Sequence, residues 1–380
     1  MNSEIKTLAK NLVNYSCKLK KGEKVLIESS PLCKDLIIEI INEVYNVGAF
    51  PFVSLGDSEI FRAIMKGTSD EHIKLLTKYM LPKMDDMDAY IGISATNNIH
   101  DLHGIDNEKI NLYSKLYSKP IHSDIRVKKT KWVILKYPTS GYAQMANMST
   151  EEFRDYYFKV CNLDYSKMNK AMQVLKALME KTDRVRIISP NTDISFSIKG
   201  INAITCAGEM NIPDGEVYTA PVKNSVNGHI QYNVPSMYNG TRFDNVYLEF
   251  ENGKIINCKA DNNNEILEAI FNIDEGARYV GEFSLGLNPY INEPMLDILF
   301  DEKISGSIHL TPGASYDDAY NGNKSAVHWD LVLNQTRAYG GGEIYFDDKL
   351  IRKDGIFVID ELKCLNPENL MWKGEKIWKK

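Results

Sequence analysis

Two histidines in the second half of the chain stand in settings that favour metal binding. His309 lies near the end of the apolar run SGSIHLTPG, just before a loop. His328 and Asp330 lie two residues apart in SAVHWDLVL, so in a strand they share one face and Trp329 takes the other. Such a pair offers an ion one imidazole and one carboxylate. H-x-D is also frequent by chance, and buried histidines often only bind backbone groups.

Two glutamates in the same half strengthen this interpretation. Glu216 follows a turn in NIPDGEVYTAP that leads directly into a strand, and Glu282 lies inside the apolar strand of GEFSLGLNP. A carboxylate that is buried in an apolar strand is costly unless a cation accompanies it. That cation is either a lysine or arginine side chain or a metal ion, and these two motifs leave both possibilities open.

Together these residues form a set of oxygen and nitrogen ligands without thiolate: Glu216, Glu282, His309, His328 and Asp330. Such a set suits two divalent ions about 3.5–4 Å apart that share carboxylate and water ligands. Ions held in this way lower the pKa of bound water and polarise a carbonyl group, which is the chemistry of amide hydrolysis. The chain has no H-E-x-x-H motif of a single-zinc peptidase and no G-x-S-x-G motif of a serine hydrolase.

Other candidate residues carry weaker signals. His100 and His103 form an H-D-L-H pair that could bind a metal, but a polar loop offers no strand or helix to fix them. Tyr316 follows His309 in HLTPGASYDDAYNG and could donate a hydrogen bond to an oxyanion, although a loop tyrosine without a catalytic role is the simpler interpretation. The six cysteines are scattered singly, which indicates buried, reduced thiols rather than disulfides or a zinc–thiolate site.

Five segments of the chain resemble the aminopeptidase T / aminopeptidase S family of metallopeptidases. They are NIPDGEVYTAP, GEFSLGLNP, KISGSIHLTPG with its following tyrosine, KSAVHWDLVL and YPTSGYAQMANMSTEEF. The resemblance covers most of residues 130–360 in scattered blocks and is much weaker over residues 1–120. It implies two divalent ions per chain, zinc, cobalt or magnesium, with Tyr316 as an active-site tyrosine beside them. The metal ligands that it implies are Glu216, Glu282, His309, His328 and Asp330.

The resemblance also implies an activity. The family removes N-terminal amino acids from peptides that have a free N-terminus, and its members form dimers that enclose the active sites. For that reaction we expect Glu282 to carry a proton to the leaving amine. The segment between Tyr316 and His328 is shorter than in family members, so a metal-dependent amidase for another small substrate is an alternative. A non-catalytic metal-binding homologue is a second alternative.

Strands and helices alternate through the first half of the chain. This alternation predicts an α/β N-terminal domain with a mostly parallel sheet. Neither G-x-G-x-x-G nor GxxxxGK[ST] occurs, so we expect this domain to be a scaffold or a substrate wall rather than a nucleotide site. The predicted strands are 24–30, 50–55, 88–95 and 131–138, and the predicted helices are 36–48, 59–66, 70–79 and 110–118.

The second half is richer in strands and begins with a helical segment. Ser149 and Glu152 form a capping-box pattern at the start of that segment, which we predict to be a bridge between domains. Asn252-Gly253 marks the tip of a hairpin over 246–260. Further strands are predicted at 184–189, 193–200 and around a turn within 342–360, with a helix at 262–271. The predicted domains are an α/β domain over 1–148, a helical bridge over 149–182, and an α+β catalytic domain rich in antiparallel strands over 183–380.

Composition excludes several other classes of protein. The 380 residues carry a net charge of −6 and are 43% hydrophobic, which indicates a globular chain without the basic surface of a nucleic-acid-binding protein. No run of eighteen apolar residues and no signal peptide is present, so we expect no membrane contact and a cytoplasmic location.

Overall fold

The computed structural model describes residues 2–371, which form two compact units. The first unit comprises Met1–Asn162 with Gly208–Pro213, and the second comprises Leu163–Ala207 with Asp214–Lys380. The segment that we predicted to be a bridge is helical, and the boundary between the units falls inside it. Helix α8 (Thr150–Cys161) belongs to the first unit and packs against α1, whereas α9 (Tyr165–Met179) belongs to the second and packs against its strands.

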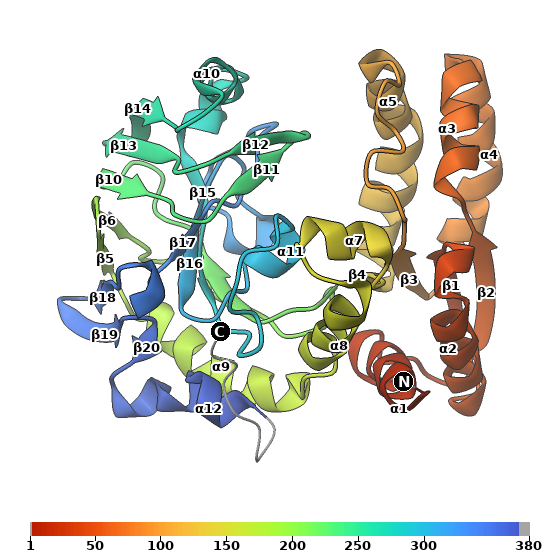
Figure 1. Ribbon diagram of the computed structural model, residues 1–380, viewed down its shortest axis with the longest axis horizontal. Helices are drawn as coiled ribbons and strands as arrows, with labels where there is room; N and C mark the ends of the chain where they lie inside the picture. The colour runs from red at the N-terminus through yellow and green to blue at the C-terminus, as the bar shows by residue number, and fades with distance from the viewer. Residues whose placement is uncertain (1, 372–380) are drawn as a thin grey trace. The chain divides into compact units, whose positions relative to one another are not determined.

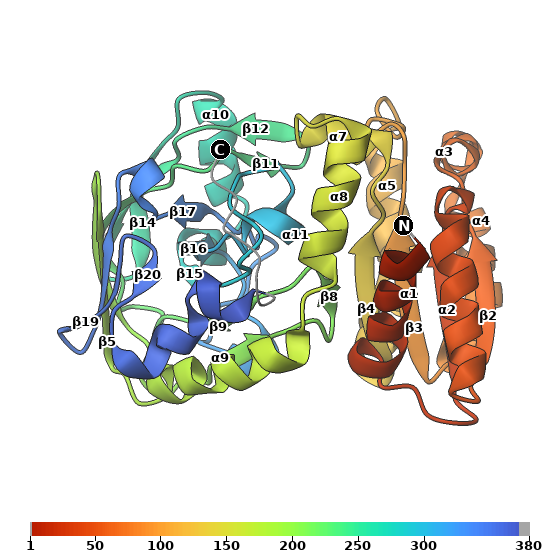
Figure 2. The same cartoon turned by 60° about the horizontal axis from the view of Figure 1, so that its bottom comes forward.

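The first unit is built on a parallel sheet in the order β2-β1-β3-β4-β8. This confirms the predicted fold class for this part of the chain, and the predicted strand positions hold to within two residues. Helices surround the sheet in Figures 1 and 2. The strands are β1 (Lys24–Ser29), β2 (Phe50–Leu55), β3 (Ala89–Ser94), β4 (Lys131–Lys136) and the short β8 (Asn211–Ile212), which joins the sheet from later in the sequence.

Several helices of this unit begin at side chains that accept hydrogen bonds from the backbone. Asp57, Ser69 and Ser149 cap α3, α4 and α8 in this way. The helix predicted over 110–118 is longer than expected. It starts as α5 and continues as a π-helical segment (Ser114–Arg126) that contains Pro120. The helices are α1 (Asn2–Lys10), α2 (Lys34–Asn46), α3 (Ser58–Gly67), α4 (Asp70–Asp85), α5 (Asn107–Tyr113), α6 (Val127–Lys129) and α7 (Ser140–Met145), together with α8.

The second unit contains a large antiparallel sheet in the order β14-β13-β10-β6-β5-β18-β19-β20. The predicted hairpin tip is confirmed, since Asn252 and Gly253 both have positive φ between β13 and β14, as a type I′ turn requires. The strands are β5 (Arg184–Ser189), β6 (Thr192–Ser197), β10 (Asn227–Gln231), β13 (Tyr247–Glu251), β14 (Lys254–Lys259), β18 (Glu343–Phe346), β19 (Lys349–Lys353) and β20 (Ile356–Phe357).

A second antiparallel sheet, in the order β17-β16-β15-β9-β7, packs inside this unit. Its central strands are wholly buried, and Phe283 on β15 meets Phe196 on β6 with ring centroids 5.0 Å apart, which joins the two sheets. The strands are β7 (Ile204–Cys206), β9 (Glu216–Thr219), β15 (Val280–Gly286), β16 (Ser307–Pro312) and β17 (Val332–Asn334). The remaining elements are β11 (Ser236–Tyr238), β12 (Thr241–Phe243), α10 (Asn264–Phe271), α11 (Ile298–Asp301) and α12 (Pro367–Leu370).

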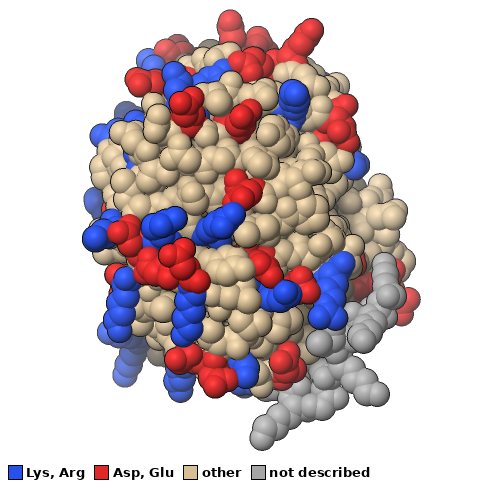
Figure 3. Space-filling model, turned by 90° about the vertical axis from the view of Figure 1, so that its left-hand side faces the viewer, with Lys and Arg blue, Asp and Glu red and all other residues tan. Residues whose placement is uncertain are grey.

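The outer face of the larger sheet carries charges of both signs. Figure 3 shows acidic and basic side chains interspersed over this face. Several are paired across strands, as Arg186 is with Asp193 at 2.8 Å and Lys353 with Glu343 at 2.9 Å. This face therefore offers no continuous basic surface. Among residues 2–371, no helix combines the length and the apolar character that crossing a bilayer requires.

Candidate metal centre

Three of the predicted ligands meet at the centre of the inner sheet. The Nε2 atom of His309 lies 3.1 Å from Glu282 Oε1 and 3.3 Å from Glu216 Oε2. All three side chains are buried, with at most 8% of any of them exposed. The predicted strand positions of the two glutamates are confirmed, because Glu216 opens β9 and Glu282 lies inside β15. His309 lies inside β16 rather than near its end.

The register of the sheet explains why these side chains meet. Ser284 on β15 is paired with His309 on β16, and Gly286 is paired with Glu216 on β9. Side chains two residues apart on one strand share a face, so Glu282 and Ser284 point to the same side as the imidazole. The Ser284 hydroxyl donates to Glu216 Oε2 at 2.9 Å, which ties β9 to the central strand β15 at the site.

His328 and Asp330 complete the cluster from the other side of Glu282. The Nε2 atom of His328 lies 3.3 Å from Glu282 Oε2 and 3.3 Å from Asp330 Oδ1. The strand predicted over these residues begins later, at Val332, because His328 makes only an isolated bridge to Gly313. The predicted alternation nevertheless holds, since Trp329 points away into the core.

A glycine makes that bridge possible. Gly313 has a φ of +111°, and a Cβ atom there would lie 2.0 Å from the carbonyl oxygen of Val327. Only glycine combines this backbone conformation with so close an approach. The close approach brings the segment of His328 against the end of β16.

Backbone carbonyls orient both imidazoles. The Nδ1 atom of His309 lies 3.2 Å from the carbonyl oxygen of Glu302, and Nδ1 of His328 lies 2.8 Å from that of Ala314. A carbonyl only accepts hydrogen bonds, so each Nδ1 carries the proton and donates it. Each Nε2 atom is then left to face the carboxylates, as in histidines that bind a metal through Nε2.

The carboxylates perturb the pKa values of both histidines. Burial alone would lower the pKa of His309 and His328, but the facing carboxylates outweigh burial and raise both values, that of His328 to about 11. Burial would raise the pKa of Glu282 and Asp330, but the histidines outweigh it and hold both below their ordinary range. The cluster is thus an anionic site that draws positive charge to the two imidazole nitrogens.

The same atoms form two groups of potential metal ligands that share Glu282. One group is Glu216, Glu282 and His309, the other is Glu282, His328 and Asp330, and within each group the ligand atoms lie within 4.8 Å of one another. His328 Nε2 is buried and has no hydrogen-bond partner among the described residues, although two carboxylates lie beside it. A divalent ion fits this arrangement, because it would satisfy the nitrogen and both carboxylates at once.

Tyr316 lies at the edge of the cluster. Its ring centroid is 4.7 Å from that of His328 and 5.7 Å from that of Tyr218, and half of its surface is exposed. Burial of part of the side chain, followed by the charges of Glu282 and Asp330, raises the pKa of the phenol, which therefore stays protonated as a donor.

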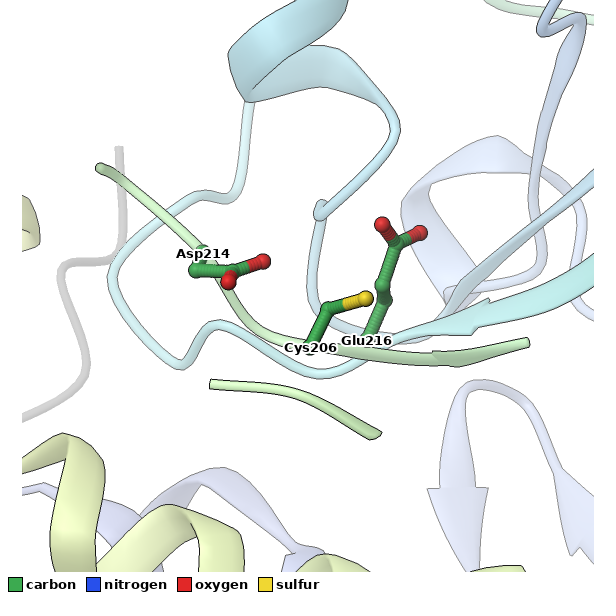
Figure 4. Close-up of side chains that lie close together, drawn as sticks. All are labelled: Cys206, Asp214 and Glu216. Carbon is green, nitrogen blue, oxygen red and sulfur yellow. The ribbon is translucent and has the colours of Figure 1, made fainter. Parts of the chain in front are cut away.

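A further group of potential ligands adjoins Glu216. Figure 4 shows Cys206, Asp214 and Glu216 close together, with Asp214 pointing toward the other two, and their ligand atoms lie within 4.8 Å of one another. Burial, followed by the charges of Asp214 and Glu216, raises the pKa of the Cys206 thiol well above its ordinary value. Lys303, which is wholly buried, places Nζ 3.7 Å from Glu216 Oε1.

The sequence motifs did not reveal several of these residues. Ser284 and Thr311, whose hydroxyl donates to Asp330 Oδ1 at 2.7 Å, lie two positions after Glu282 and His309, so the period of a strand could have indicated them. Lys303 lies in the turn after α11, where the letters DEKISG are typical of exposed chain. His100 and His103 lie in turns of the first unit and take no part in the cluster.

Comparisons with known proteins place this site in context. A family model described as thermophilic metalloprotease (M29) matches residues 1–347. Aminopeptidase AmpS of Bacillus subtilis is 25% identical over 87% of this chain and 89% of its own length, and aminopeptidase T of Thermus thermophilus is 24% identical over 87% and 92%. The solved structure of wild-type AmpT from Thermus thermophilus has a similar fold, with a TM-score of 0.80 and 22% identity over 94% of this chain and 99% of that one.

Proposed function

This chain belongs to the thermophilic metalloprotease family M29 and is a metal-dependent aminopeptidase, and we propose that it works with two divalent ions held in the cluster around Glu282. The observation that carries this proposal is the orientation of the Glu282 carboxylate. One of its oxygens faces His309 and the other faces His328, so it can bridge two ions. The proposed ligands are Glu216, Glu282 and His309 for one ion, and Glu282, His328 and Asp330 for the other.

The ions would polarise the carbonyl group of the first peptide bond and lower the pKa of a bound water. The side chains of this chain then have distinct tasks. The Tyr316 phenol, protonated and beside His328, is placed to donate a hydrogen bond to the carbonyl oxygen as negative charge develops there. Thr311 holds Asp330 in place through its hydroxyl.

Glu282 is also our candidate for carrying a proton to the leaving amine. The two proposed roles of Glu282 conflict. A carboxylate that bridges two ions uses both of its oxygens as ligands, whereas a carboxylate that carries a proton needs one oxygen free. The variant Glu282→Gln separates them, since its amide oxygen remains a weak ligand but cannot carry a proton. We expect it to lose turnover and one of the two ions together if bridging dominates, and turnover alone if proton transfer dominates.

The remaining features of the proposed function follow from the family. We propose zinc, cobalt or magnesium as the ion, because oxygen and imidazole ligands accept all three. We also propose peptides with a free N-terminus as substrates, a homodimer, and a cytoplasmic location. Size-exclusion chromatography with light scattering tests the dimer, and a monomer at micromolar concentration would contradict it.

The function is tested on purified protein that has been dialysed against chelator. Zinc, cobalt, magnesium or manganese is then restored, and release of p-nitroaniline from leucine-p-nitroanilide is measured. We expect activity to return with metal and to saturate at two ions per chain. Protein that binds no divalent ion would refute the metal centre. Two bound ions without release from any unblocked amino-acid amide would favour the amidase alternative.

A further inference from the structure

Lys303 is a buried cation at the edge of the metal centre. None of its surface is exposed, and it follows α11 in the turn that leads to β16. Its Nζ lies 3.7 Å from Glu216 Oε1 and contacts the carboxylate of Glu302. A buried lysine is rare unless anionic groups surround it, so its position here calls for an explanation.

The neighbours of Lys303 are the third group of potential metal ligands. Asp214, Glu216 and Cys206 all interact electrostatically with its ammonium group. The ligand atoms of these three residues lie close enough together to bind one ion, and Figure 4 shows the three side chains side by side. The group nevertheless already has a positive charge within reach, because the ammonium lies in contact range of the Glu216 carboxylate.

We propose that Lys303 supplies the positive charge of the Cys206–Asp214–Glu216 group in place of a metal ion and so fixes how Glu216 faces the metal centre. The proposal rests on the proposed function, because it assigns Glu216 to the metal centre. Lys303 is a positioning residue in this scheme, since it acts through Glu216 and touches no substrate.

The two oxygens of Glu216 show how this positioning works. Oε1 lies toward Lys303, whereas Oε2 accepts from the Ser284 hydroxyl at 2.9 Å and lies 3.3 Å from His309 Nε2. A carboxylate that is held at both oxygens cannot rotate about its own axis. Glu216 therefore presents Oε2 alone to the ion beside His309, and Lys303 keeps Oε1 from taking up a further ion.

The proposal predicts which sites cobalt occupies. Cobalt bound to a thiolate gives an intense near-ultraviolet charge-transfer band, which oxygen and imidazole ligands do not give. In the wild-type protein we expect two cobalt ions per chain and no thiolate band. In Lys303→Ala, which removes the charge and opens space, we expect one further cobalt ion per chain and a thiolate band. Adding Cys206→Ala to that variant should abolish the band.

Two control variants isolate the charge of Lys303. Lys303→Arg keeps a cation and should bind no further cobalt. Arg352→Ala removes another wholly buried cation of the same unit, one that donates to the Ser307 carbonyl and to Gln335 rather than to carboxylates. It should lose stability without gaining cobalt. A further ion in this control would show that any loosening of the unit has the same effect, and would overturn the proposal.

Other results would also overturn the proposal. Lys303→Ala with unchanged cobalt content and no thiolate band would show that the ammonium does not stand in for an ion. If Lys303→Ala does not fold, Cys206→Ala in the wild-type background replaces it. This variant should leave the cobalt content and the spectrum unchanged. A lost ion would refute the proposal, as would a thiolate band in the wild-type protein itself. Wild-type protein that binds no cobalt would instead contradict the proposed function.

Discussion

Removal of the metal ions should make the stability of this protein fall as the pH rises above about 6.5. In the protein without metal, the carboxylates of the cluster hold protons on His309 and His328 and raise the pKa of both. A histidine whose pKa is raised on folding contributes stability below its unfolded value of 6.5. That contribution is lost progressively as the pH rises from 6.5 to the folded value, which is about 11 for His328, and none of it remains above that value.

The size of the effect follows from the number of protons. Each imidazole that is protonated only in the folded state lowers the free energy of unfolding by about 1.4 kcal/mol for each unit of pH. The raised pKa of His328 should therefore cost about 3 kcal/mol over two pH units above the unfolded pKa, and the raised pKa of His309 acts in the same direction. Glu282 and Asp330 do not oppose this trend, because their pKa values are lowered and their contribution is lost only at acidic pH. Ions bound by the proposed ligands would replace these protons, so the loaded protein should lack this slope.

Thermal unfolding measures the prediction directly. The midpoint is followed by circular dichroism between about pH 6.5 and 8.5 for protein in chelator and for protein loaded with zinc, because that window lies above the unfolded pKa. The gap between the two midpoints should widen steadily with pH. The variant His328→Gln without metal should lose the part of the slope that His328 contributes, since its proton is absent. A midpoint in chelator that stays level or rises over this window would refute the argument.

Three further predictions concern individual side chains. His328→Ala should reduce turnover of leucine-p-nitroanilide below a few per cent of wild type with an unchanged circular dichroism spectrum, and substantial residual activity would remove it from the centre. Thr311→Val deletes the buried 2.7 Å hydrogen bond to Asp330 and should weaken metal binding about tenfold or more in a competition titration with chelator, whereas unchanged affinity would show that Asp330 needs no such support. Tyr316→Phe keeps the ring against His328 and should lower kcat by about 10²–10³ while both ions stay bound; a change in KM alone would argue for a role in substrate binding.

Much of the fold could be predicted because local signals agreed with the final structure. Apolar runs bounded by polar turns placed β15 and β16 with their buried Glu282 and His309, and Asn252-Gly253 placed a hairpin tip. The parallel sheet followed from the alternation of strands and helices. In each case the residues that decide the structure lie within a few positions of one another, where strand period and turn chemistry act.

The parts that depend on distant pairing could not be predicted in this way. Nothing in the sequence states that Gly286 pairs with Glu216, and this register brings β9 beside β15. The return of β8 to the first sheet is likewise a long-range pairing, between Asn211 and Ile134. Lys303 was missed for a related reason, since its burial follows from the packing of a turn between two elements rather than from a local pattern.

Trp329 connects the proposed metal centre to the core by packing, and its fluorescence can report on the state of that centre. Its indole lies among Tyr238, Phe243 and Phe271, with ring centroids 4.9 to 6.1 Å away, and it stands between the two proposed ligands His328 and Asp330 in the sequence. A shift of either ligand on metal loss therefore reaches the indole through one peptide unit on each side. The fluorescence of this tryptophan should record the loading of the site, and mutations that loosen the aromatic pocket should accelerate the escape of metal even though none of them touches a ligand.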